Sequence, residues 1–208
     1  EIIFTGTGDA ASNRRVLRMV QDKKLRKLYQ GVYTSNLESP AESIVTRYWA
    51  DIVSHLLPDG VVSYRSGFDT KPVDACIYIT RGKTPRTVEL PGLTVKVIPG
   101  SGAVEGDVPY KKLFLAGQSR WLLENLATGR GVSERIIPQE MLESELDKIL
   151  SIRGEYRFNE LRDNCRKLAD SLERRKEFSR LDALMGALLG THESKKLRSH
   201  QAIARAAG

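Results

Sequence analysis

Seven basic side chains fall within a short stretch near the start of this chain: Arg14, Arg15, Arg18, Lys23, Lys24, Arg26 and Lys27. Within that stretch only Asp22 carries the opposite charge. Val16, Leu17 and Val20 recur at helical spacing in the segment 10–21, which predicts a helix with its arginines on another side. Arginine and lysine bind phosphate oxygens, and arginine also pairs with guanine edges. We therefore predict that these seven residues bind DNA; the alternative is a basic face that is only solvated.

The residues after this helix read as a β-hairpin. Residues 25–33 alternate in part between apolar and polar side chains, and Gly31 interrupts them as in a turn. Arg26 and Lys27 would then lie on a wing beside the DNA backbone. A complete helix-turn-helix has further helices before its recognition helix. Here Ile2–Phe4 read as a strand before a glycine loop, so we expect only part of a winged helix.

The glycine loop before the helix suggests a different function. Gly6-Thr7-Gly8-Asp9-Ala10-Ala11 fits the pattern G-x-G-x-x-A, between an apolar run and a helix. That layout is found where a dinucleotide binds, with its pyrophosphate at the helix N-terminus. It also needs a parallel second strand that ends in an acidic residue, and the segment at that distance is basic. Nucleotide binding is therefore the minor alternative.

No nucleophile or metal-ligand pattern is present elsewhere in the sequence. The chain lacks a G-x-S-x-G, an H-E-x-x-H and a P-loop motif. His55, His192 and His200 are scattered, and Cys76 and Cys165 lack the spacing of metal ligands or of a disulfide framework. We therefore expect no catalysis, no metal and no cofactor from this chain as it stands.

Composition favours a cytoplasmic globular protein that binds a polyanion. The 208 residues carry a formal net charge of +7, and nucleic acid is the usual partner of a basic protein. No apolar run is long enough to cross a bilayer, and two cysteines suit a reducing compartment. Because the chain begins at Glu1 and residues 202–208 read as an unfinished helix, we expect a piece of a longer protein.

The pattern along the chain predicts an α+β fold in three parts. Residues 1–38 hold the basic helix and the hairpin, in a partial winged-helix-like unit. Residues 39–135 form a mixed α/β region with a sheet. Residues 136–208 form a helical segment that leads to a further domain, with a polar and charged linker at residues 191–196.

The middle part opens with a strong helix signal. Ser39 can cap the free amides, Pro40 suits the first helical position, and Glu42 can complete a capping box. The turn residues 58–60 would end this helix. Runs of β-branched and aromatic residues predict strands at 61–64, 75–80, 87–90, 94–98 and 113–116. Ser119 is expected to cap the helix that follows.

Apolar spacing in the last third predicts three more helices. They cover residues 138–152, residues 159–176 and a segment from Leu181 that Gly190 would end. Cys165 falls on the apolar face of the second, so we expect it in the core.

Two segments resemble the AbiEi family of antitoxins and transcriptional regulators. Leu25-Arg26-Lys27-Leu28-Tyr29-Gln30-Gly31-Val32-Tyr33 looks like the wing of these proteins. Val61-Val62-Ser63-Tyr64-Arg65-Ser66-Gly67-Phe68 resembles the strand-then-helix block that follows. The combined pattern also resembles the region before the catalytic domain of some bacterial Fic proteins, where residues 181–191 and 199–208 look like the helices that lead into that domain.

The resemblance implies a regulatory module and not a complete enzyme. AbiEi-like antitoxins bind DNA and repress transcription, so the implied partners are DNA and a cognate toxin or Fic domain, in cis or in trans. Fic enzymes transfer AMP through a loop with a histidine, a phenylalanine, an acidic residue and a glycine-asparagine-glycine-arginine run, which this sequence lacks. The alternative function is a protein-interaction module, in which the Trp49 helix or the C-terminal helices dock a Fic domain without DNA binding.

Overall fold

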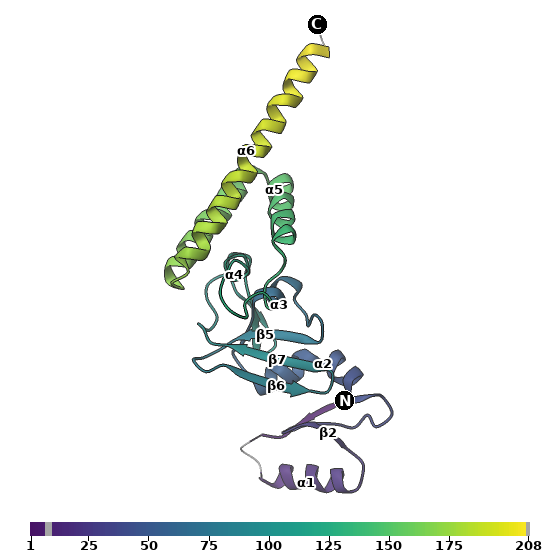
Figure 1. Ribbon diagram of the computed structural model, residues 1–208. Helices are drawn as coiled ribbons and strands as arrows, with labels where there is room; N and C mark the ends of the chain where they lie inside the picture. The colour runs from purple at the N-terminus through teal and green to yellow at the C-terminus, as the bar shows by residue number, and fades with distance from the viewer. Residues whose placement is uncertain (7–9, 207–208) are drawn as a thin grey trace. The chain divides into compact units, whose positions relative to one another are not determined.

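The first part of the chain contains all the described strands together with three helices, and helices dominate the rest, which confirms the predicted α+β class. The computed structural model describes residues 1–6 and 10–206. The chain divides into two compact units, Glu1–Ala116 and Gly117–Gly208. Figure 1 shows their elements in chain order.

The first unit begins with a helix on a small antiparallel sheet. Its elements are β1 (Ile2–Phe4), α1 (Ala10–Gln21), β2 (Arg26–Tyr29) and β3 (Val32–Thr34). The sheet has the order β1-β3-β2, and both pairings are antiparallel. The predicted helix and the predicted hairpin are therefore both present.

Alternate residues of the small sheet pack into two different cores, because successive side chains of a strand point to opposite faces. Ile3 and Tyr33 pack with Val16 of α1. Their neighbours Ile2 and Val32 pack instead into the larger core of the same unit. The basic helix and hairpin thus share one folded body with the residues that follow them.

Helix α2 (Ala41–Leu56) begins one residue later than its predicted cap implies. Pro40 occupies the N-cap position, and no side chain caps the helix. The predicted capping box is wrong because the Ser39 hydroxyl accepts a hydrogen bond from the Asn36 amide, 3.0 Å away. The predicted end is confirmed, since α2 stops before residues 58–60.

A mixed six-stranded sheet fills the rest of the first unit. Its strands are β4 (Val61–Val62), β5 (Cys76–Thr80), β6 (Arg86–Leu90), β7 (Leu93–Ile98), β8 (Val108–Tyr110) and β9 (Leu113–Leu115). Their order is β6-β7-β5-β4-β9-β8, with β5 parallel to β7 and β4 parallel to β9. Apolar residues of α2, among them Ile52 and Val53, share a core with the sheet residues Ile77 and Val95.

The strand predicted at residues 61–64 is shorter than expected. It stops at Val62, because Ser63 is the N-cap of helix α3 (Tyr64–Asp69). The order of a strand and then a helix is the one that the resemblance to AbiEi proteins implies for residues 61–68. Tyr64 holds a left-handed backbone conformation, with φ of 55°, at this change of direction.

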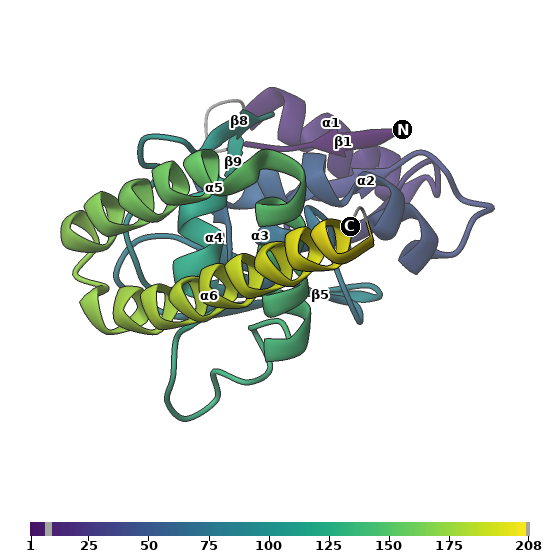
Figure 2. The same cartoon turned by 90° about the horizontal axis from the view of Figure 1, so that it is seen from above.

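The second unit contains α4 (Gln118–Glu124), α5 (Gln139–Ser171) and α6 (Arg175–Ala206). Figure 2 shows the second half of α5 antiparallel to the first half of α6. Gly117, and not the predicted Ser119, is the N-cap of α4. Within the described residues, no helix is both long and apolar enough to cross a membrane.

Two of the predicted breaks in the last third are wrong, and a third is present as a kink. Gly154, with φ of 76° and ψ of 169°, breaks α5 between the two helices predicted there. The predicted stop at Gly190 and the predicted linker at 191–196 both lie inside α6. A glycine weakens a helix by only about 1 kcal/mol, so it ends one only where the backbone turns left-handed.

Candidate nucleic-acid interface

Helix α1 has one anchored side and one exposed basic side. Val16 is its buried residue, and Arg14, Arg15 and Arg18 are exposed. Arg14 and Arg18 are one helical turn apart, so they lie on the same side of the helix. Leu17, 53% exposed, also lies outside the core. The helix therefore offers solvent a surface of arginines with one apolar side chain beside them.

Three lysines continue the basic surface beyond the helix. Lys23 and Lys24 lie in the turn after α1, where Lys23 has a φ of 55° and the Lys24 amide donates to the carbonyl of Met19, 2.8 Å away. Lys27 lies on β2 and is exposed, like the other two. The turn and the hairpin thus hold these lysines next to α1 in the chain.

The cations of this surface have no carboxylate partners in the part of the chain that the structure describes. We call Arg14, Arg15, Arg18, Lys23, Lys24 and Lys27 the α1 surface. The Arg14 Nε donates to the carbonyl of Ala10, 3.2 Å away, which leaves its charge uncompensated. Exposed charges without partners are available to a polyanion at no cost in broken ion pairs.

Arg26, the seventh predicted residue, has a different environment. Its guanidinium donates to the backbone carbonyls of Asn36 and Ser39, and the side chain is half-buried. Its Nε is buried and has no partner within the described residues. Arg26 therefore ties β2 to the segment before α2, and its donors point into the protein.

We predict that Arg26→Ala lowers the free energy of unfolding of the chain by about 1–3 kcal/mol, because two partly buried carbonyls lose a charged donor. Lys27→Ala is the matched control: it is one residue away and exposed, so its effect should stay within about 0.5 kcal/mol. Urea unfolding measures both. Equal stability of the two variants, with a loss of DNA affinity in Arg26→Ala, would instead make Arg26 a DNA contact.

The strands around the glycine loop do not have the layout of a dinucleotide site. That site needs parallel strands joined by a helix. Here β1 pairs antiparallel with β3, and β2 is not its neighbour. Gly6 is exposed, and residues 7–9 of the loop lie outside the described residues.

The Trp49 helix and the C-terminal helices, the two surfaces predicted as alternatives for docking a partner domain, differ in exposure. Trp49 of α2 is partly buried, and its ring lies 6.2 Å from that of Tyr110. Ile152 and Tyr156 of α5 are 73% and 79% exposed, on either side of the Gly154 kink. The C-terminal helices thus present apolar surface, whereas Trp49 is already packed in its own unit.

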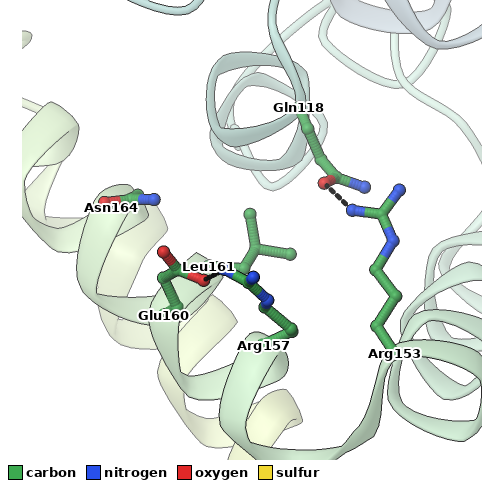
Figure 3. A pocket seen from close by; sticks show the side chains of 6 residues that line it. All are labelled: Gln118, Arg153, Arg157, Glu160, Leu161 and Asn164. Atoms are coloured by element: carbon green, nitrogen blue, oxygen red, sulfur yellow. Dashed lines mark hydrogen bonds and ion pairs between the residues drawn. The ribbon is translucent and has the colours of Figure 1, made fainter.

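An open depression of about 490 Å³ lies beside that kink in the second unit (Figure 3). Arg153 donates to the Gln118 side chain over 3.3 Å, and Arg157 pairs with Glu160 over 2.7 Å. Leu161 and Asn164 complete the lining. Because each arginine already has a partner, the depression has no set of free donors directed at one ligand.

The thiol and imidazole groups among the described side chains show no catalytic arrangement. Burial raises the pKa of Cys165 to about 11, so the thiol stays protonated near neutral pH and is a core residue as predicted. His55 stacks on Phe4, with ring centroids 4.5 Å apart. The described residues contain no group of three His, Cys, Asp or Glu side chains that could hold a metal ion.

No protein-family model, curated protein or solved structure matches this chain.

Proposed function

We propose that this chain is a DNA-binding regulatory module of the antitoxin type, which acts in the cytoplasm as a transcriptional autorepressor. In this proposal α1 lies along a groove of duplex DNA, and the β2–β3 hairpin lies as a wing on the phosphate backbone. The resemblance to AbiEi proteins and to the region before Fic domains supports the same role. The AMP-transfer step would then belong to a domain outside this chain.

The observation that carries the proposal is the α1 surface. Six cations lie on one helix, its turn and its hairpin, and none has a carboxylate partner in the described residues. The opposite side of α1 is held on the small sheet by Val16, which fixes the direction in which the arginines project. Arginines on an anchored helix can reach both phosphates and guanine edges, and Leu17 beside them could contact a thymine methyl group.

A salt series tests the proposal. The purified chain is titrated against a duplex with its own promoter sequence and against a random duplex of equal length, with fluorescence anisotropy as the readout. We expect log affinity to fall linearly with log salt, with the six cations of the α1 surface contributing about −5 to the slope if all of them meet phosphates, and we expect tighter binding to the promoter. Absence of binding at low salt would contradict the proposal.

A second candidate function is a protein-interaction module that docks or restrains a Fic domain or a cognate toxin. The exposed side chains Ile152 and Tyr156, which flank the Gly154 kink of α5, favour it, because large side chains left in solvent are often covered by a partner's surface. A chain that fails to bind DNA at low salt would support this function in place of the first.

A further inference from the structure

A second basic segment lies in the first unit, far from α1 in the sequence. Residues 81–86 read Arg-Gly-Lys-Thr-Pro-Arg and contain no acidic residue. Lys83 and Arg86 are exposed, and Arg81 is half-buried. Among the residues that the structure describes, none forms an ion pair with these three cations. The side chains of Arg81, Lys83 and Arg86 are not part of the α1 surface.

Ordered backbone holds this segment in place. β5 and β7 are parallel and end at the same edge of the sheet, and their pairing continues past the strand ends. The Arg81 amide donates to the carbonyl of Ile98 over 3.0 Å, and the Gly100 amide donates to the carbonyl of Gly82 over 2.9 Å. Arg86 begins β6, next to the end of β7. The three cations are therefore fixed at the ends of paired strands.

The other charges at this edge leave the segment basic. Asp59 and Lys112, where β4 and β9 begin, offset one another in charge. The segment after β7 carries Glu105 and Asp107, and the Asp107 carboxylate accepts a hydrogen bond from the Val104 amide over 3.0 Å. The excess of positive charge is thus confined to the side of the edge formed by β5 and β6.

The basic edge and the wing lie at the same end of the first unit. β4 follows α2 after a short link, and Val61 pairs with Thr80, so α2 ends at the edge where β5 ends. Near the end of α2, His55 stacks on Phe4, and a Cβ at Gly31 would lie 3.8 Å from its Nε2 atom. Gly31 is the turn of the β2–β3 hairpin, which Figure 1 shows below the mixed sheet.

We infer that Arg81, Lys83 and Arg86 form a second contact for the phosphate backbone of duplex DNA, an inference that rests on the proposed function. β7 separates β5 from β6, so Arg81 and Arg86 are about 10 Å apart along the edge. A row of that length spans about three phosphate steps, because the phosphates of each strand follow at about 3.4 Å of helix axis. A single small phosphate would need donors that converge on one point, and these cations are spread along the edge.

The test is the triple variant Arg81→Ala/Lys83→Ala/Arg86→Ala in the same salt series. We expect affinity for the promoter and for the random duplex to fall by the same factor, about 10-fold or more, because phosphates carry no sequence information. The salt slope should become shallower by about 3. The variant Arg130→Ala/Lys167→Ala/Lys176→Ala removes three exposed cations of the second unit and should change neither quantity by a comparable amount.

Two outcomes separate this inference from the proposed function. If the wild-type chain binds DNA and the 81–86 triple variant keeps its affinity and salt slope, the second contact is refuted and the α1 surface stands. If the wild-type chain binds no DNA, both are refuted. Lys83→Ala alone guards against misfolding, because the Lys83 side chain is exposed and forms no ion pair within the described residues; it should make the slope shallower by about 1.

Discussion

Replacing Arg14, Arg15 and Arg18 by alanine together is expected to lower promoter affinity by at least about 100-fold. Each arginine that meets a base or a phosphate is worth about 1–3 kcal/mol, and three such losses combine. The salt slope should become shallower by about 3, and the preference for promoter over random duplex should shrink, because the proposed interface places these side chains at phosphates and base edges. Fluorescence anisotropy across a salt series measures all three quantities.

The variant should fold like the wild-type chain, because all three side chains are exposed and form no ion pair within the described residues. The matched control is again Arg130→Ala/Lys167→Ala/Lys176→Ala, which removes the same charge from the second unit. If both triple variants lose the same affinity, binding follows net charge alone and α1 has no special role. An unchanged affinity in the α1 variant would refute the proposed interface.

The second large effect concerns stability and lies in α4. Arg120 and Glu124 are 2% and 1% exposed, and the Nε atom of Arg120 lies 3.0 Å from the Oε1 atom of Glu124. Arg120→Ala leaves a buried carboxylate without this cation, which costs about 3–5 kcal/mol in comparable pairs. We expect the free energy of unfolding of the second unit to fall by that amount, measured by urea unfolding.

A double variant distinguishes the loss of a charge partner from the loss of packing. Arg120→Leu/Glu124→Leu removes both charges and keeps apolar volume, so it should recover most of the stability that Arg120→Ala loses. A double variant as unstable as Arg120→Ala would show that packing or other hydrogen bonds of Arg120 account for the effect. DNA affinity should stay unchanged in a folded variant, because α4 lies outside the α1 surface.

Local sequence was enough to predict most elements of this fold. The helical spacing of Val16 and Val20 predicts α1, and Gly31 between two short apolar runs predicts the β2–β3 hairpin, which has a left-handed glycine at its turn. These signals are local: helical periodicity and turn chemistry act over a few residues. The exposure of the α1 cations follows in the same way, because an amphipathic helix buries its apolar side.

Local patterns were misleading where residue type alone suggested a cap or a stop that the backbone does not adopt. Ser39 has the right type and place for a cap, but Asn36 takes its hydroxyl. Gly190 reads as a stop, but nothing turns the backbone left-handed there, so α6 continues. The break that does occur, at Gly154, depends on one unusual pair of backbone angles.

The class of the fold, the basic helix and its hairpin were all predictable from the sequence, since these depend on the order of residue types along short segments. The different roles of Arg26 and Lys27 could not be predicted from the sequence, because the two residues are neighbours of the same charge. The tertiary structure separates them: the Arg26 guanidinium donates to backbone carbonyls, whereas the Lys27 side chain is exposed. The structure likewise placed Arg81 and Arg86 at one edge, because strand pairing, which joins distant residues, sets which side chains become neighbours.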